Sequence, residues 1–386
     1  MTVSNRELFE LEKLVKILHI GKYYPPYYKG GIEDHVMVLC EELKREIQVE
    51  VLVANNKIKT EIDHINEVSF TKLGRWAVVA GTPVCPALLY RINKYSADII
   101  HVHMPNPWAE LCLLTTKLRK KLVASFHCDI IRQKSLFALY RPFLLRFLKK
   151  VDRIIAATPL HIEYSPVLGQ FKDKCRVIPY GINPDRFRPD TPIVTLANSI
   201  RQKTQNSKII LFVGRLVYYK GLDYLIKAMK NIAAVLLVVG TGPLLKTMQE
   251  LVKTMQLEKK VLFAGEISEE QLPAYYRACD VFVLPSTART EAFGIVQLEA
   301  MSSYKPVIST NLKTGVPYVN QDGKTGIVVP PADSEILAEA IQRLLTNEAL
   351  CRQMGENGYR RVREEFTKER MGQRTLALYQ DVLSNT

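Results

Sequence analysis

Short apolar runs alternate along the chain with longer segments in which apolar residues return every three or four positions. The runs have the length and composition of buried strands, and the periodic segments have the pattern of amphipathic helices. Strands are predicted at residues 15–20, 49–53, 98–103, 122–126, 153–158, 176–181, 208–215, 233–240, 261–267, 280–286, 305–310 and 323–330. Several runs are apolar throughout, as in sheets covered on both faces. The order of elements therefore predicts an α/β protein with two doubly wound, Rossmann-like domains.

Several stretches depart from this alternation. Pro and Asp residues gather at 184–189, and we place a domain boundary near residue 187. Residues 190–207 are polar, which predicts a surface loop at the start of the second domain. Residues 1–14 mix acidic and apolar residues, so we expect a short helical extension rather than a signal peptide.

Two glutamates, Glu291 and Glu299, stand eight positions apart around a short turn. A strand is predicted before them and a helix around Glu299. Glu291 is therefore expected in the loop at the carboxyl end of a strand, and Glu299 about two turns into the helix. Ligands of open α/β sheets bind beyond this edge of the sheet. By itself, the spacing also fits two solvated glutamates at a strand–helix junction.

Backbone amides and cations are expected at the same edge. The amides of Phe293, Gly294 and Ile295 fall where the helix begins, and free amides at a helix N-terminus attract phosphate. Arg215 and Lys220 share one strand-to-helix loop. Fixed cations in such a loop can stabilise the negative charge that grows on a diphosphate leaving group.

A glycine pair, Gly30-Gly31, lies between the first predicted strand and a helix. Glycine allows close backbone approach, so this loop is a candidate phosphate cradle. The loop lacks the G-x-G-x-x-G pattern, so dinucleotide binding is not favoured.

Histidines mark the ends of two strands in the first half. His101 and His103 lie on one face of a predicted strand, and His127 follows the next one, two residues before Asp129. No third ligand is in view beside His101 and His103, so no metal site is predicted. We expect His103 and Asp129 to line the acceptor side of a cleft.

The order of these motifs resembles one large family. The glutamate pair, the Arg215–Lys220 loop, Gly30-Gly31 and the segment around residues 178–189 resemble retaining nucleotide-sugar glycosyltransferases of family 4, also called glycosyl transferases group 1. The resemblance implies the GT-B fold, in which two Rossmann-like domains face each other across a cleft. Residues 1–186 would bind the acceptor and 187–365 the nucleotide-sugar donor, while 366–386 would form a helix that crosses back to the first domain.

The same resemblance implies a role for each site residue. The donor diphosphate would be bound by Arg215, Lys220 and Gly31, the ribose by Glu299, and the base by Glu266 and Ile267. The transferred sugar would contact Phe293, Gly294 and Ile295, and the catalytic residues would be His127 and Glu291. Neither a cofactor nor a metal would be required, and the second half contains no D-x-D motif.

A second resemblance indicates which nucleotide sugar is the donor. Residues 126–134, together with 22–26, are similar to those of bacterial mannosyltransferases that build O-antigen or related polysaccharides. GDP-mannose is therefore the expected donor, and a saccharide or lipid-linked glycan the expected acceptor. A UDP-linked glucose, galactose or N-acetylglucosamine is the alternative. Three other functions are compatible with the sequence: a sugar-nucleotide epimerase of the same fold, a phosphorylase and a non-catalytic membrane-binding module. A phosphorylase would need a lysine that binds pyridoxal phosphate, and the sequence shows no motif for one.

Charge and composition add a possible membrane partner. The chain has 386 residues, a formal net charge of +14 and seven scattered cysteines. Scattered cysteines without C-x-x-C fit free thiols in a reducing cytoplasm. Residues 130–151 combine basic and large apolar side chains without an acid, which fits either an interfacial helix or a core helix with a solvated basic edge. We expect a cytoplasmic protein, with a peripheral position on the inner face of the cytoplasmic membrane if that helix binds lipid, and no nucleic-acid partner.

Overall fold

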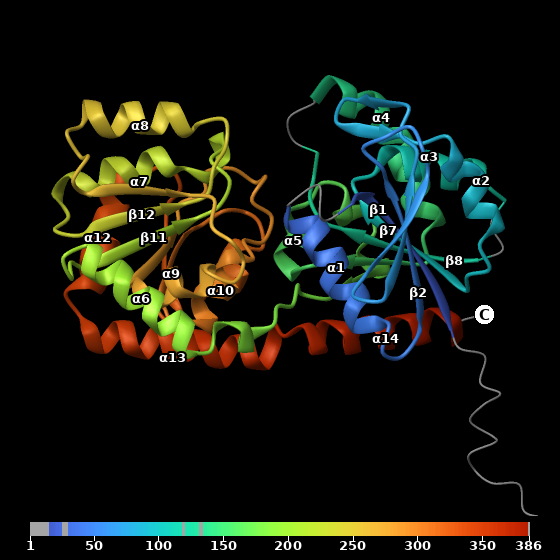
Figure 1. The fold of residues 1–386 in the computed structure, drawn as a ribbon. Helices are drawn as coiled ribbons and strands as arrows, with labels where there is room; N and C mark the ends of the chain where they lie inside the picture. The colour runs from blue at the N-terminus through green and yellow to red at the C-terminus, as the bar shows by residue number, and fades with distance from the viewer. Residues whose placement is uncertain (1–14, 25–29, 118–119, 131–133, 385–386) are drawn as a thin grey trace, which may run out of the picture. The chain divides into compact units, whose positions relative to one another are not determined.

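A computed structural model describes residues 15–24, 30–117, 120–130 and 134–384 (Figure 1). The extension predicted at 1–14 and the start of the basic segment, at 131–133, lie outside these residues. Contacts divide the chain into two units. The first contains Met1–Ala156, Pro166–Ile178 and Lys368–Thr386, and the second contains Ala157–Ser165 and Pro179–Thr367.

The division falls a few residues away from the predicted boundaries. Tyr180, Phe187 and Phe366 are buried together in the core of the second unit. The second unit therefore begins before residue 187 and ends after residue 365.

Eight strands form the main sheet of the first unit, in the order β10-β9-β8-β7-β1-β2-β4-β3. All neighbours pair in parallel except β3 and β4, which are antiparallel. The strands are β1 (Lys16–Tyr23), β2 (Gln48–Ala54), β3 (Glu61–Ile65), β4 (Val68–Leu73), β7 (Ile99–Met104), β8 (Lys121–Phe126), β9 (Arg153–Ala156) and β10 (Cys175–Val177), and a separate hairpin is formed by β5 (Ala77–Val79) and β6 (Thr82–Val84). The six strands predicted in this half are confirmed, whereas β3 to β6 were not recognised from the sequence.

Two helices cover one face of this sheet. The helices of the first unit are α1 (Gly31–Leu43), α2 (Ala87–Lys94), α3 (Pro107–Thr115), α4 (Lys134–Lys150) and α14 (Lys368–Ser384). α14 packs along α1 (Figure 1). Both helices contact one row of strand residues that includes Ile17, Ile99 and Val123. Because strand side chains alternate between faces, His19, His101 and His103 lie on this same covered face.

α4 packs into the first unit through its C-terminal end. Three apolar residues there are buried: Leu144, Phe147 and Leu148. Three apolar residues toward its N-terminal end are exposed: Leu136 at 53%, Leu139 at 73% and Phe143 at 44%. One end of this helix is therefore buried in the unit, whereas apolar side chains at the other end are exposed. Within the described ranges, no helix is long and apolar enough to cross a membrane.

Six parallel strands form the sheet of the second unit, in the order β13-β12-β11-β14-β15-β16. They are β11 (Ile209–Val213), β12 (Val235–Val239), β13 (Val261–Gly265), β14 (Val281–Leu284), β15 (Val307–Thr310) and β16 (Gly326–Val329), and they confirm the six predicted strands. Alternate residues of β11 belong to two different hydrophobic clusters, with Leu211 in one and Phe212 in the other. The sheet is therefore covered on both faces, as its continuous apolar runs predict.

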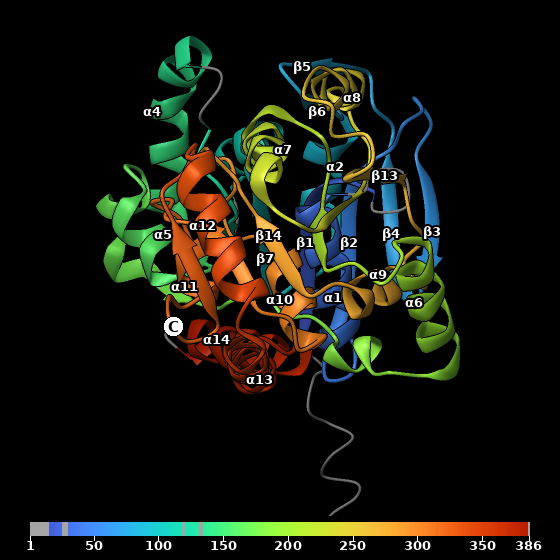
Figure 2. The ribbon, with the colours of Figure 1, turned by 90° about the vertical axis from the view of Figure 1, so that its left-hand side faces the viewer.

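Helices pack on both faces of the second sheet. They are α5 (Pro159–Tyr164), α6 (Thr191–Lys203), α7 (Leu222–Ala228), α8 (Leu245–Thr254), α9 (Leu272–Ala278), α10 (Val296–Ser302), α11 (Val316–Val319), α12 (Ser334–Leu345) and α13 (Glu348–Glu365). α7, α8 and α12 contribute to one cluster, and α7 and α12 pack side by side (Figure 2). α6, α9 and α10 contribute to the other cluster.

The surface loop predicted at 190–207 is wrong, because most of this segment forms α6. Asp190 caps the helix by accepting a hydrogen bond from the Ile193 amide. Ile193, Ala197 and Ile200 recur at helical spacing and are buried. The partly buried Leu196 packs against the same core, so the segment is amphipathic although it contains many polar residues.

Candidate active site

Lys220 and Glu291 form a buried ion pair at the carboxyl edge of the second sheet. Lys220 ends a short 3₁₀ segment after β11, and Glu291 lies in the loop after β14. Because β11 and β14 are parallel neighbours, their following loops lie at the same edge. Nζ of Lys220 lies 2.6 Å from Oε2 of Glu291, which also accepts a hydrogen bond from the Ser286 hydroxyl at 3.0 Å. The structure thus brings together the predicted phosphate-binding lysine and the predicted catalytic carboxylate.

Lys220 remains protonated although its side chain is buried. Burial alone lowers the pKa of Lys220, but the Glu291 carboxylate opposes this effect, and the net pKa is raised. The ammonium group is therefore present at neutral pH. It has three N–H donors, so one can bond Glu291 while others face a phosphate.

Glycines on both sides of Lys220 make this position possible. Gly221 has a φ of +64°, and a Cβ there would lie 2.1 Å from the Pro285 carbonyl oxygen. At Gly214, a Cβ would lie 3.4 Å from Cε of Lys220. Any larger residue at Gly221 would displace the loop that carries the ion pair.

Glu299 lies on the first turn of α10, not two turns into the helix as predicted. Gly294 has a φ of +75°, and the helix begins only at Val296. The hydroxyl of Tyr276 donates to Oε2 of Glu299 at 2.6 Å. Burial raises the pKa of Glu299, while the hydrogen bond from Tyr276 acts in the opposite direction. A carboxylate near a helix N-terminus that holds a tyrosine hydroxyl can accept further hydrogen bonds from a ligand's hydroxyl groups.

The three residues of the predicted sugar-contacting turn differ in what they expose. The side chain of Phe293 is 2% exposed and packs on Tyr180, with ring centroids 4.8 Å apart. It therefore supports the turn from within and offers only its backbone to a ligand, a limit that the sequence does not reveal. Gly294 is buried and Ile295 is half-buried.

The remaining residues predicted on the donor side follow two strands of the same sheet. Arg215 is exposed just after β11. Glu266 is exposed and Ile267 half-buried just after β13, the edge strand. All three thus lie beyond the carboxyl ends of parallel strands in one sheet, where ligands of such sheets bind.

His127 lies at the carboxyl end of β8 in the first unit, where the sequence predicts it. The side chain is 2% exposed, and its backbone amide donates to the Met104 carbonyl at 3.1 Å. Its Nε2 lies 3.1 Å from Nδ1 of His103. Gly31 begins α1 in the same unit and is exposed.

The side chain of His103, which was expected on the acceptor side of the cleft, is buried within the first unit. Its side chain is 1% exposed, and its two ring nitrogens bond to His127 and His19. It lies behind His127, on the face of the sheet covered by α1 and α14. Its contacts are thus with other protein side chains.

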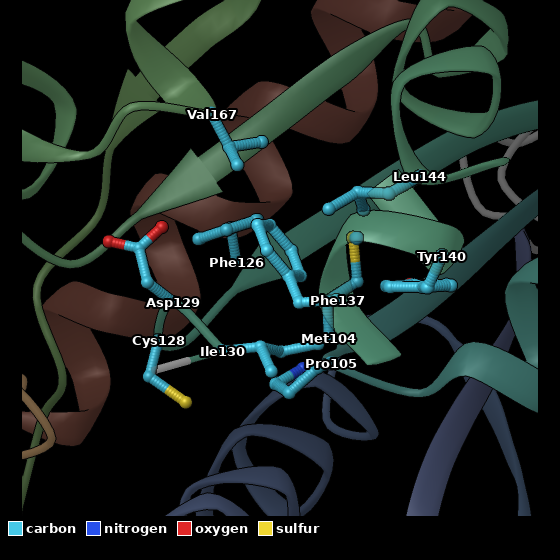
Figure 3. Close-up of a pocket in the computed structure, with 10 residues that line it drawn as sticks. All are labelled: Met104, Pro105, Phe126, Cys128, Asp129, Ile130, Phe137, Tyr140, Leu144 and Val167. Atoms are coloured by element: carbon cyan, nitrogen blue, oxygen red, sulfur yellow. The ribbon is translucent and has the colours of Figure 1, made fainter. Parts of the chain in front are cut away.

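Asp129 is half-buried and lies beside a small apolar cavity under α4 (Figure 3). The cavity volume is about 10 Å³, enough for roughly one water molecule. Its lining comprises Met104, Pro105, Phe126, Cys128, Asp129, Ile130, Phe137, Tyr140, Leu144 and Val167. The Asp129 carboxylate points away from the apolar side chains (Figure 3). This cavity is too small for a sugar, so an acceptor would have to meet Asp129 from outside it.

Sequence reasoning missed two histidines. His19 from β1 and His35 from α1 join His101, His103 and His127 in two groups of three whose ligand atoms lie within 4.8 Å of one another. These groups are near enough to hold a metal ion by distance alone. The third ligand that the sequence did not show thus comes from other elements. Parallel pairing of β1 with β7 brings His19 opposite His101.

Comparisons with known proteins agree with this architecture. The family model described as Glycosyltransferase Family 4 matches residues 29–186, and the model described as Glycosyl transferases group 1 matches residues 197–361. O-antigen chain mannosyltransferase C of Escherichia coli is 33% identical over 96% of this chain and 100% of its own length. D-rhamnosyltransferase WbpZ of Pseudomonas aeruginosa is 34% identical over 92% of each chain.

One further relative and one solved structure extend the comparison. A GDP-mannose-dependent alpha-(1-6)-phosphatidylinositol monomannoside mannosyltransferase of Mycolicibacterium smegmatis is 27% identical over 89% of this chain and 92% of its own length. Sucrose-phosphate synthase from Thermosynechococcus elongatus has the same fold, with a TM-score of 0.80 at 24% identity over 96% of this chain and 100% of its own. The chain belongs to the glycosyltransferases of group 1, family 4, and has the GT-B fold that its motifs predict.

Proposed function

We propose that this glycosyltransferase transfers mannose from GDP-mannose, with retention of configuration, to a saccharide or lipid-linked glycan in cell-surface polysaccharide synthesis. The buried ion pair of Lys220 and Glu291 carries the proposal, because it places one cation and one carboxylate at the ligand edge of the donor unit. The names of the mannosyl-transferring relatives support mannose, and one of those names specifies GDP-mannose.

In the proposed reaction, the bond between the sugar's anomeric carbon and the diphosphate breaks with its electron pair on the diphosphate. Lys220 and Arg215 stabilise that growing negative charge. Their cationic groups would make a divalent cation unnecessary. Activity that persists in excess EDTA supports this, and activity that EDTA abolishes and Mg²⁺ restores contradicts it.

Glu291 acts in this proposal as an electrostatic stabiliser rather than a nucleophile. One of its oxygens already accepts bonds from Lys220 and Ser286, which lowers its tendency to attack carbon. The carboxylate would instead accept hydrogen bonds from sugar hydroxyls and stabilise positive charge at the anomeric carbon. The acceptor oxygen would attack from the face that the diphosphate leaves, and its proton would pass to the departing phosphate oxygen.

Five other side chains complete the proposed donor and acceptor sites. Glu299, held by Tyr276, would accept hydrogen bonds from the ribose hydroxyls. Glu266 and Ile267 would border the base, His127 would contact the transferred sugar, and Asp129 would meet the acceptor. The backbone of Gly31 would approach the diphosphate.

We also propose that α4 docks on an anionic membrane surface, where a lipid-linked acceptor would be available. Its exposed apolar residues Leu136, Leu139 and Phe143 follow one another at helical spacing. Arg141, Arg146 and Lys149 are exposed on the same helix. The protein would then work at the inner face of the cytoplasmic membrane.

The direct test of the reaction uses purified enzyme, a lipid-linked glycan acceptor and separate GDP-mannose, UDP-glucose, UDP-galactose and UDP-N-acetylglucosamine donors. Mannose transfer with an α-linkage in the product's NMR spectrum, matching the donor's configuration, is the expected result. Transfer from a UDP-sugar alone would retain the enzyme class and overturn the donor. A β-linked mannose would overturn retention.

A further inference from the structure

His127 belongs to a cluster of buried histidines in the first unit, and the proposed reaction does not use the others. His19, His101, His103 and His127 are each at most 2% exposed, and His35 is 7% exposed. They come from β1, β7, the end of β8 and α1. Polar rings in such a core require hydrogen-bond partners.

The first part of the cluster is a line of three rings. Nε2 of His127 lies 3.1 Å from Nδ1 of His103, and Nε2 of His103 lies 3.0 Å from Nδ1 of His19. The rings of His103 and His127 are stacked with an interplanar angle of 7°, and those of His19 and His103 with an angle of 20°. Each contact therefore joins one ring nitrogen to the next.

The line continues through the C-terminal helix α14. Nε2 of His19 lies 3.4 Å from the Tyr379 hydroxyl, which lies 2.6 Å from Nδ1 of His101. Nε2 of His101 lies 2.8 Å from the Ser125 hydroxyl. We call this chain of hydrogen bonds the histidine relay; its members are His127, His103, His19, Tyr379, His101 and Ser125.

The three inner rings of the relay, those of His19, His101 and His103, are neutral. Burial lowers the pKa of His19 to about 3, and it lowers the pKa of His101 and of His103 well below the ordinary value. A neutral imidazole has one N–H donor and one lone pair. Because each inner ring uses both nitrogens within the relay, the hydrogen bonds must all run in one direction or all in the other.

Tyr379 selects the direction. Burial raises the pKa of its hydroxyl well above the ordinary value, so the hydroxyl keeps its single proton. The 2.6 Å contact to His101 is shorter than the usual range for an N–H donor but within the range for an O–H donor, whereas the 3.4 Å contact to His19 is long. The proton therefore lies toward His101, and His19 donates to the tyrosine oxygen from Nε2.

The remaining protons follow from that choice. His19 carries its proton on Nε2, so its Nδ1 accepts from Nε2–H of His103. Nδ1 of His103 in turn accepts from Nε2–H of His127. At the other end, His101 donates from Nε2 to Ser125.

We propose that the histidine relay fixes His127 as the tautomer with its proton on Nε2 and a lone pair on Nδ1, and that His103, His19 and Tyr379 are positioning residues for His127. The catalytic consequence rests on the role proposed above for His127: Nδ1 would accept a hydrogen bond from a substrate hydroxyl rather than donate one. The tautomer itself does not depend on that role.

The histidine relay and a metal site would use the lone pairs of the same ring nitrogens in different ways. A bound ion needs three lone pairs that point at it. In the relay, the lone pairs of His103 and His19 each accept an N–H from the next ring. The hydrogen bonds in the described structure therefore favour protons over a metal ion.

The test is an NMR experiment on the full chain labelled with ¹⁵N-histidine. The His127 signals are identified by their loss in His127→Asn. The expected wild-type spectrum has the His127 proton on Nε2. In Tyr379→Phe, the N–H of His19 loses its acceptor and the reverse direction becomes accessible, so the Nδ1 resonance of His127 should move toward the protonated chemical shift.

Two further variants make the test decisive. Thr375→Val removes a buried hydroxyl one turn earlier on α14, which donates to the Met371 carbonyl at 2.8 Å, and it should leave the His127 spectrum unchanged. If Tyr379→Phe does not fold, Ser125→Ala removes the acceptor at the far end of the relay and should produce the same shift.

Three outcomes would overturn the relay. They are a wild-type His127 with its proton on Nδ1, a His127 spectrum that neither variant changes, and stoichiometric zinc in protein purified without a chelator. Absence of sugar transfer with every donor, together with the expected tautomer, would refute the proposed function and leave the relay intact.

Discussion

The Tyr276 hydroxyl donates a hydrogen bond to Oε2 of Glu299 at 2.6 Å, and it joins α9 to the first turn of α10. Burial, followed by the nearby Glu299 carboxylate, raises the pKa of Tyr276 well above its ordinary value. The hydroxyl thus remains a donor at any physiological pH. Glu299 is thereby held in one orientation before a ligand arrives.

Tyr276→Phe should weaken GDP binding roughly fivefold, or about 1 kcal/mol, because the carboxylate loses one fixed hydrogen bond. Glu299→Ala should cost more, about 1–3 kcal/mol, because buried ribose hydroxyls would lose their acceptor. The double variant should bind as weakly as Glu299→Ala alone, since Tyr276 acts through Glu299. Isothermal titration with GDP measures all three, with Tyr275→Phe as the control. Additive losses would show that Tyr276 acts independently.

Lys220→Met should lower the free energy of unfolding by about 3–5 kcal/mol, because it leaves the buried Glu291 carboxylate without its cation. Adding Glu291→Gln should recover most of that loss, since the unpaired charge is then gone. Denaturant unfolding of the single and double variants measures the difference.

The control for that pair is Lys227→Met, which breaks a more exposed contact with Asp223 at 3.4 Å. It should cost about 0.5 kcal/mol or less. A Lys220→Met variant no less stable than Lys227→Met would show that the buried pair contributes little to folding.

Glu110 should make the stability of the first unit depend on pH. Burial raises its pKa from 4.5 to about 8, against the opposing effects of the Asn106 amide and Lys22. Between these two pH values, the folded protein keeps the proton while the unfolded chain releases it. The stability contribution is therefore present at pH 4.5 and below, and it is lost as the pH rises to about 8.

The Glu110→Gln side chain has no proton to lose. The free energy of unfolding of this variant, relative to that of the wild type, should therefore rise with pH. The difference in free energy of unfolding should increase by about 1.4 kcal/mol per pH unit between pH 5 and pH 7. Urea unfolding at several pH values measures it. A difference that stays constant over this range would contradict the raised pKa.

Leu139→Ser should reduce binding to vesicles that contain anionic lipid by roughly tenfold or more, because the exposed leucine on α4 would no longer enter the interface. Leu89→Ser changes a 43% exposed leucine on α2 of the same unit and should leave binding unchanged. Vesicle sedimentation at low and high salt measures both. Equal binding by wild type and Leu139→Ser would exclude this face of α4 as the docking surface.

The order of strands and the family could be predicted because apolar runs and short motifs are local properties of the sequence. All twelve predicted strands form, and the motif residues at the sheet edges lie in the expected loops. α6 was missed because polar residues separate the apolar residues that face the core, Ile193, Leu196, Ala197 and Ile200. β3, β5 and β6 were missed because they are short and most of their residues are partly or fully exposed, whereas the six-residue β4 was missed because Ser69, Thr71 and Lys72 interrupt its apolar positions.

The errors in the site arise from contacts between elements far apart in the sequence. His103 was expected to be accessible to an acceptor because the sequence does not show its neighbours. In the structure, His19 of β1 contacts His103, and Tyr379 of α14 contacts His19. Glu299 was placed too deep in its helix because the positive φ of Gly294 delays the helix start. The sequence did not identify the hydrogen-bond donors to Glu291 and Glu299; the packing brings Ser286 to the first and Tyr276 to the second.

The measurement that tests the central claim most directly is the thermal stability of the full chain with GDP, UDP, ADP and dTDP, followed by their sugars. A ligand that binds only the folded protein raises its apparent stability. The proposal predicts that GDP and GDP-mannose raise the unfolding temperature, and that Lys220→Met and Glu299→Ala each diminish the increase. Stabilisation by UDP or UDP-sugars alone would contradict GDP-mannose as the donor, and no response to any nucleotide would contradict a donor site in the second unit.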